Sequence, residues 1–275
     1  MNSVFKIENL ECAYSNGNPV LHIQDLEIPK GKLVFVLGVS GIGKSTLIET
    51  LGLMNNTIKN SDQCKIHFSN KDINENIGDI WKKDNDFISS FRRKHFSFIF
   101  QNTNLMPNFT AGENMAVRML LEGERIEDSK ERVMHFMDKL NLERSLFDRN
   151  IYELSGGQRQ RLAFVRAIAS DFGVLFGDEP TGNLDKNTSH RLMSTLKEIL
   201  EDLEGSGLIV SHDIPLALNF ADIILLLSRR DAVTDPVGRV EKEHYLVRQD
   251  EGAWKNILGD SINEPHEFIN QVLLK

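Results

Sequence analysis

The segment Gly38–Thr46, which reads GVSGIGKST, restricts the possible folds more than any other part of the chain. It directly follows the apolar run Leu33–Leu37, which is typical of a strand buried on both faces. Glycines at this spacing let the backbone wrap closely around an anion, which then faces the amides of a following helix. The segment therefore predicts a phosphate-binding loop between a strand and a helix. Its expected phosphate ligands are Gly38, Ser40, Gly41, Gly43, Lys44, Ser45 and Thr46.

Two side chains of this loop have separate expected roles. Lys44 should neutralise the outer phosphates of a nucleotide, and the Ser45 hydroxyl should bind Mg²⁺. The alternative is a glycine-rich turn with an exposed lysine, but the full pattern arises by chance in about 1% of chains of this length. Nucleotide binding is favoured, and the loop alone does not distinguish kinases, GTPases and transport ATPases.

A second glycine-rich motif is Leu154-Ser155-Gly156-Gly157-Gln158. Ser155 followed three residues later by Gln158 predicts a capped helix start. Two glycines in the first turn cost stability unless another group must approach the backbone closely. A capped surface helix is the structural alternative to a binding role.

This motif resembles the signature motif of the ABC ATPases, and the order of motifs over residues 5–227 is similar to that family. The resemblance implies that the Ser155 hydroxyl and the Gly157 N–H contact the γ-phosphate of ATP held by a second cassette. Gly156 and Gln158 belong to the same expected ATP-binding motif. A kinase does not carry this signature.

The apolar run Val174–Phe176 leads through Gly177 to Asp178 and Glu179, and this sequence resembles the family's Walker B strand. A carboxylate at the carboxyl end of a parallel strand lies where α/β sheets bind ligands. Asp178 is expected to hold Mg²⁺ directly or through water, and Glu179 to polarise the attacking water as general base. Most Asp-Glu pairs are solvated surface, but the buried strand and the upstream loop favour the catalytic interpretation.

Four further positions match the family. Gln101 matches the Q-loop, where its amide would reach Mg²⁺ or the attacking water, and His212 matches the histidine that contacts the γ-phosphate. Asp185 matches the D-loop, which crosses the dimer interface. Tyr14 matches the position where an aromatic ring stacks on adenine, although its spacing equally allows a core side chain.

Two longer stretches, Phe100–Asn114 and Asp178–Asp185, resemble the branch that contains lipoprotein-release, macrolide-efflux and cell-division ATPases. These are separate cassettes that pair with membrane proteins, several of which transmit force rather than pass a substrate. Three features depart from the branch. The segment before Gln101 is longer than usual, Ser170–Gly173 replaces a more usual alanine and proline, and the tail after Ser228 is unfamiliar.

Hydrophobic patterning and the resemblance together predict an α/β fold. The expected P-loop NTPase core has a mostly parallel sheet, an N-terminal antiparallel β subdomain and an inserted helical subdomain, as in ABC ATPases. Val4–Leu10 and Val20–Ile28 alternate like antiparallel strands around a turn at residues 16–19, and Leu208–Val210 and Ile223–Leu227 read as buried strands. Lys186–Leu203 reads as an amphipathic helix.

These elements divide the chain into an expected cassette at 1–228 and a C-terminal extension of unknown role at 229–275. The helical subdomain is expected at about 102–153, with two helical patterns between Ala111 and Ile151. The polar segment Asn55–Asn85 is expected to be a loosely ordered arm or edge, and Glu267–Leu274 an amphipathic helix.

Composition limits the partners and the location. A net charge of −8 argues against nucleic-acid binding, which needs a basic face, although Arg92–Lys94 could form a local basic patch. Cys12 and Cys64 show neither metal-ligand spacing nor the density of a disulfide framework, which favours a reducing, cytosolic setting. Residues 1–6 lack a secretory signal, and no apolar run approaches the roughly 20 residues of a membrane span. We therefore expect a peripheral protein at the cytoplasmic face of a membrane.

The predicted function is the ATP-binding and ATP-hydrolysing subunit of an ABC transporter, using ATP and Mg²⁺. Two copies should associate head to tail, with ATP between Lys44 of one and Ser155 of the other, while Gln101–Asn114 docks helices of a separate permease. A regulatory ATPase that controls a membrane partner without moving a substrate remains the alternative. A soluble ABC ATPase of translation or DNA repair is disfavoured, because the chain has one cassette and no long coiled coil.

Overall fold

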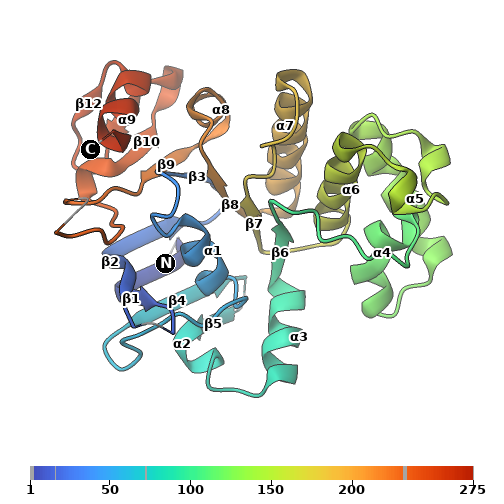
Figure 1. Ribbon diagram of the computed structural model, residues 1–275, viewed down its shortest axis with the longest axis horizontal. Helices are drawn as coiled ribbons and strands as arrows, with labels where there is room; N and C mark the ends of the chain where they lie inside the picture. The colour runs from blue at the N-terminus through green and yellow to red at the C-terminus, as the bar shows by residue number, and fades with distance from the viewer. Residues whose placement is uncertain (1–2, 16, 72, 232–233, 275) are drawn as a thin grey trace.

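An eight-stranded sheet forms the centre of the computed structural model, in the order β12-β11-β10-β9-β3-β8-β7-β6 (Figure 1). The structure describes residues 3–15, 17–71, 73–231 and 234–274. The five strands from β9 to β6 are parallel and almost wholly buried, which confirms the predicted parallel core. The strands of this sheet are β3 Leu33–Leu37, β6 Phe96–Ile99, β7 Val174–Asp178, β8 Ser206–Ser211, β9 Ile223–Leu226, β10 Tyr245–Arg248, β11 Trp254–Asn256 and β12 Ser261–Ile262.

A four-stranded antiparallel sheet, in the order β2-β1-β4-β5, packs on the central sheet. Its strands are β1 Ser3–Ala13, β2 Pro19–Pro29, β4 Lys65–Asn70 and β5 Ile73–Asn76. The predicted pairing of the first two strands is confirmed, with Lys6 opposite Glu27 and Glu8 opposite Asp25. Asn16, which belongs to the predicted turn, lies outside the described residues.

The predicted loose order of Asn55–Asn85 is wrong, because this segment contains β4, β5 and the short helix α2 Ile77–Ile80. Ile66 and Phe68 alternate inward from β4 and are fully buried, and the Phe68 ring lies 5.3 Å from the Phe5 ring on β1. Two buried apolar residues among polar neighbours were enough to fix a strand. The alternative prediction for this segment, a sheet edge, is confirmed for β5, which is the last strand of its sheet.

The central sheet separates two hydrophobic cores. On β3, Leu33, Phe35 and Leu37 face the core beneath α7 Lys186–Leu203 and α8 Ile214–Phe220. Val34 and Val36 face the opposite core, which α1 Lys44–Leu51 and the antiparallel sheet cover. Because both faces are covered, the strands read as continuous apolar runs, and their carboxyl ends open at one edge. Helix α7 begins and ends at the residues predicted for it.

A helical unit projects from the β6 side of the sheet and contains α4 Ala111–Leu121, α5 Ile126–Lys139 and α6 Gly156–Ile168 (Figure 1). Both helices expected between Ala111 and Ile151 are present as α4 and α5. Helix α3 Asn85–His95 precedes β6 and leads from the antiparallel sheet into this region. The strand β6 is therefore the link between the sheet and the helical unit.

The tail after Ser228 continues the central sheet. Strands β10, β11 and β12 extend it antiparallel from β9, and helix α9 Pro265–Leu273 packs on α8 and β9. Arg248 lies over the Trp254 ring at 4.8 Å and donates to the Ala221 carbonyl at 2.7 Å. These contacts give the tail a defined place beside the core.

Candidate active site

The phosphate-binding loop connects β3 to α1 through two glycines in the left-handed region, Gly41 with φ 74° and Gly43 with φ 103°. An L-residue would strain the backbone at either position. Lys44 is 8% exposed and donates from Nζ to the Gly38 carbonyl at 2.8 Å and the Val39 carbonyl at 3.0 Å. Burial lowers the pKa of Lys44, and the charges of nearby acidic residues oppose that shift. The ammonium group thus lies inside the loop, where an anion could replace its carbonyl partners.

Asp178 lies beside the first turn of α1, at the end of β7. Burial raises the pKa of Asp178, whereas its hydrogen bond with Ser45 and the charge of Lys44 act in the opposite direction. The paired hydroxyl and carboxylate are hard oxygen donors of the kind that Mg²⁺ prefers. Across the described ranges, no group of three or more His, Cys, Asp and Glu side chains could hold a metal ion.

Three predicted site residues meet at the carboxylate of Glu179. Its Oε1 lies 3.3 Å from Nδ1 of His212, and its Oε2 accepts from Nε2 of Gln101 at 3.5 Å. Glu179 has a positive φ of 47°, uncommon for a residue with a side chain, and its N–H donates to the Val210 carbonyl at 3.0 Å. The backbone bond holds this conformation in the lining of a pocket of about 340 Å³.

The sheet order explains why these side chains converge. β6, β7 and β8 are parallel neighbours, with Ile99 opposite Gly177 and Asp178 opposite Val210. Gln101, Glu179 and His212 each follow the carboxyl end of one of these strands. Residues far apart in the sequence therefore reach the same edge of the sheet.

Tyr14 lies next to the first turn of α1. Its hydroxyl is 2.9 Å from the Thr46 hydroxyl, and the residue is 43% exposed. It is therefore not a buried core side chain, and part of its surface is open to a ligand.

The signature motif begins α6 with the predicted capping box. The Ser155 hydroxyl accepts from the Gln158 N–H at 3.2 Å, and the Gln158 side chain accepts from the Ser155 N–H at 2.8 Å. A Cβ added at Gly156 would have no described atom within 4 Å, and one at Gly157 would meet only Leu184 Cδ2, at 3.8 Å. Packing within the chain therefore does not require either glycine.

Asp185 caps α7, where its carboxylate accepts from the Thr188 N–H at 3.0 Å and the Thr188 hydroxyl at 2.6 Å. These bonds lower the pKa of Asp185. Sequence reasoning missed Gln160, whose Nε2 donates to the Pro180 carbonyl at 2.8 Å and joins α6 to the loop after Glu179. Its position on the buried face of α6, at helical spacing from Phe164, could have identified it.

The predicted site residues form two separate groups in one chain. Helices α1 and α6 lie on opposite sides of the β7 and β8 strands (Figure 1). In the part of the chain that the structure describes, no hydrogen bond joins Ser155–Gln158 to the loop Gly38–Thr46. One copy therefore carries both halves of a possible site without joining them.

A groove of about 470 Å³ lies between α3, β6, α4 and α6. Its described lining includes Arg92, Arg93, Arg118 and Arg166, and none of these lining residues is a carboxylate. Phe98, Phe100, Met106, Val117 and Leu121 provide its apolar surface. A basic, partly apolar groove suits an amphipathic partner segment with negative charge.

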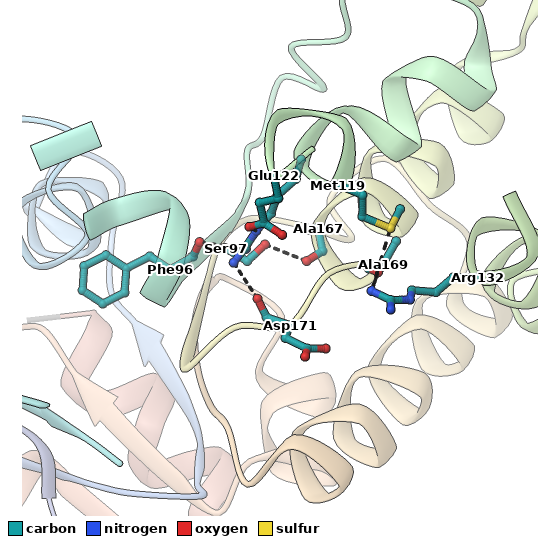
Figure 2. Close-up of polar contacts among 9 residues, drawn as sticks. Phe96, Ser97, Met119, Glu122, Arg132, Ala167, Ala169 and Asp171 are labelled. Carbon is teal, nitrogen blue, oxygen red and sulfur yellow. Dashed lines mark hydrogen bonds and ion pairs between the residues drawn. The ribbon is translucent and has the colours of Figure 1, made fainter. Parts of the chain in front are cut away.

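Arg118 of α4 ties this groove to the sheet. It donates to the carbonyls of Phe96, at the start of β6, and Asp171, just before β7. Arg132 of α5 donates to the Ala169 carbonyl at 3.3 Å in the same region (Figure 2). Sequence patterns could not separate these arginines from solvated ones, because their acceptors are backbone groups of distant segments.

The ABC transporter family profile matches residues 21–182. The lipoprotein-releasing system ATP-binding protein LolD of Bdellovibrio bacteriovorus is 32% identical over 218 residues, which cover 78% of this chain and 94% of LolD. The macrolide export ATP-binding/permease protein MacB of Photorhabdus laumondii is 32% identical over 230 residues, covering 82% of this chain and 33% of MacB. A dimeric structure of the ATP-binding cassette MJ0796 in a post-hydrolysis state, bound to ADP and Pi, aligns with a TM-score of 0.71. It is 28% identical and covers 81% of this chain and 93% of that cassette. No described helix combines the length and hydrophobicity that a bilayer crossing requires.

Proposed function

The chain belongs to the ABC transporter family as an ATP-binding and ATP-hydrolysing subunit, and from that premise we propose that two copies close around two ATP molecules to drive a membrane permease. The observation that carries this proposal is the separation of the two halves of the site within one chain. A head-to-tail pair would place Ser155 of one copy opposite Lys44 of the other. The open space at Gly156 and Gly157 leaves room for that approach.

ATP would bind with its phosphates in the loop Gly38–Thr46. The amides of this loop and of the first turn of α1 would face the phosphates, and the Lys44 ammonium would exchange its carbonyl partners for phosphate oxygens. Ser45, Asp178 and Gln101 would hold Mg²⁺, which supplies charge neutralisation when bound. Tyr14 would stack on adenine with its exposed face, while its hydroxyl stays on Thr46.

Glu179 would accept a proton from the attacking water. Its two oxygens face different partners, His212 and Gln101, so the plane of the carboxylate is set from both sides. His212, with 67% of its side chain exposed, is free to reach the γ-phosphate when ATP is present. Across the interface, the Ser155 hydroxyl and Gly157 N–H would contact that phosphate, and Asp185 would approach the partner copy.

The groove between α3, β6, α4 and α6 would receive the permease. Arg118 is paired with Glu122 at 3.2 Å, and Arg92 and Arg166 already donate to backbone carbonyls of this chain. Arg93 and the apolar wall would therefore be the surface that meets a cytoplasmic helix with a carboxylate beside an apolar face. Gln101 follows β6, so one end of that strand faces the nucleotide site and its side chains line the groove. The chain would then lie peripherally at the cytoplasmic face of the membrane.

A second function uses the same apparatus. The ATPase could control a membrane partner mechanically without moving a substrate, as in the cell-division members that the sequence resembles. Identifying the membrane protein that copurifies, and whether it has a large extracytoplasmic domain, separates the two functions.

The Glu179→Gln variant tests the proposal directly. Its amide cannot accept the proton, so turnover should be lost, while MgATP should still convert the purified variant from monomer to dimer in light scattering. Glu201→Gln, an exposed position on α7, is the matched control and should keep wild-type turnover. Undiminished hydrolysis by Glu179→Gln would refute the assignment of the base. A variant that binds MgATP yet stays monomeric, even with the membrane subunit supplied, would refute the dimer.

A further inference from the structure

We propose that the tail after Ser228 positions the phosphate-binding loop through Gly238 and so sets the affinity for ATP. This inference rests on the proposed phosphate-binding role of Gly38–Thr46. It gives a function to the part of the chain that the family resemblance leaves unexplained.

The backbone of Gly238 touches the phosphate-binding loop directly. Gly238 is buried, and a Cβ built on it would lie 2.1 Å from the Ile42 carbonyl oxygen and 3.2 Å from its carbonyl carbon. An oxygen and a carbon cannot approach so closely, so any side chain here forces one of the two segments to move. The obstacle is backbone, which cannot rotate away as a side chain can.

The tail side of this contact is firmly held. The Gly238 N–H donates to the Val20 carbonyl at 3.1 Å, and the His22 N–H donates to the Gly238 carbonyl at 2.9 Å. The next residue, Arg239, exchanges two backbone hydrogen bonds with Ser228, at 2.9 and 3.0 Å. Four backbone bonds therefore fix the tail at Gly238, between β2 and the end of β9.

The loop side has a glycine on each side of the contact. Ile42 lies between Gly41 and Gly43, whose backbones can adopt conformations closed to other residues. Gly43 also packs on Val20, because a Cβ there would lie 3.2 Å from the Val20 carbonyl oxygen. The start of β2 thus supports both the loop and the tail, and the loop is the segment that yields when the contact is overfilled.

Displacing Ile42 would misdirect the neighbouring amides that face phosphate. Loss of one hydrogen bond to a charged phosphate raises Kd about tenfold. Gly238→Ala should therefore raise the Kd for MgATPγS, measured by titration calorimetry, by about that factor. The KM for ATP should rise in parallel, while kcat at saturating ATP stays within about twofold, because the base and the signature motif are untouched.

Gly259→Ala is the matched control. Gly259 also lies in the tail, has φ 100° and would have no described atom within 4 Å of an added Cβ. Alanine there strains the tail and should lower the melting temperature without changing Kd. A Kd for Gly238→Ala equal to wild type, or an equal increase in Gly259→Ala, overturns the inference.

Hydrogen exchange of the wild-type chain provides a second test that needs no variant. If the tail favours ATP binding, binding must stabilise the tail to the same degree. MgATPγS should therefore slow exchange of the Gly238 and Arg239 amides, and unchanged exchange at both overturns the inference. Failure of the wild-type chain to bind MgATPγS at all would instead refute the proposed phosphate site.

Discussion

Replacing Gly157 with alanine should stabilise the nucleotide-free chain and prevent ATP-dependent assembly. Gly157 is in the first turn of α6 with helical backbone. Among the described atoms, Leu184 Cδ2 is the one that its added Cβ would meet, at an ordinary contact distance of 3.8 Å. The monomer therefore accepts the methyl group. In the proposed dimer, the same methyl group would stand between the Gly157 N–H and the partner's γ-phosphate.

The substitution should therefore stabilise the folded monomer and destabilise the ATP-bound dimer, and the two free-energy changes differ in size. A compatible Gly→Ala change stabilises by about 0.4–1 kcal/mol, because it restricts the unfolded chain. For a protein of this size, that is a rise in melting temperature of about 1–4 °C. Losing one charge-assisted hydrogen bond at each of two sites costs about 3–6 kcal/mol of dimer stability, or roughly 10²–10⁴ in the dimer dissociation constant.

The assay combines calorimetric melting without nucleotide and sedimentation with MgATP, both in a Glu179→Gln background that blocks turnover. Gly78→Ala is the control, since Gly78 lies in the first turn of α2 with an ordinary contact at 3.4 Å. It should leave dimerisation unchanged. A lower melting temperature for Gly157→Ala would show that the folded monomer has no room for the methyl group. If the chain with both substitutions dimerises as tightly as the chain with Glu179→Gln alone, the contact between Gly157 and the partner's γ-phosphate is refuted.

Three further predictions concern single side chains. Asp178→Asn should abolish turnover yet raise the melting temperature at pH 7, because burial raises the pKa of Asp178 and so disfavours its ionised form in the folded chain. In melts across pH, this gain in melting temperature should shrink as the pH falls toward 3.8, the ordinary aspartate pKa. Below that pH, the carboxyl group is protonated in both the folded and the unfolded chain. Tyr14→Ala should raise the KM for ATP roughly tenfold through lost stacking, whereas Tyr14→Phe keeps the ring and should change KM little in steady-state assays. Arg118→Gln should lower the free energy of unfolding in urea by about 1 kcal/mol, since it leaves the part-buried Phe96 carbonyl without its donor, whereas water can replace the donor at Asp171. An unfolding midpoint equal to wild type would contradict this role of Arg118.

The elements predicted well are those that a local pattern specifies. Continuous apolar runs located four of the five parallel strands, β3, β7, β8 and β9, but not β6, whose apolar residues are interrupted by Ser97. The stripe along Lys186–Leu203 located α7 at both ends. The spacing of Ser155 and Gln158 was enough for the capping box, because its two bonds join residues three apart. Such features depend on short-range geometry, which sequence shows directly.

The features missed depend on contacts between distant segments. β4 is specified by Ile66 and Phe68 meeting β1, about sixty residues earlier in the chain. Arg118 in the groove is held by hydrogen bonds to backbone carbonyls of distant segments. The contact of Gly238 with Ile42 likewise joins the tail to the first third of the chain. The roles of the candidate site residues stay predictions. The sheet order does bring Gln101, Glu179 and His212 together, as a shared role in ATP hydrolysis requires.

Strand β6 joins the candidate catalytic residues to the proposed docking groove. Its carboxyl end leads to Gln101, which contacts Glu179, and its first residue, Phe96, accepts from Arg118 on α4. Arg118 also donates to the carbonyl of Asp171, the residue that leads toward β7 and Glu179. A rotation of the helical unit would therefore pull on the starts of both strands whose ends carry Gln101 and Glu179. Because these strands are short and packed on both faces, they would transmit a displacement rather than absorb it. A helix pressed into the groove, and an ATP whose attacking water contacts Gln101 and Glu179, would thus act on the same two strands from opposite ends.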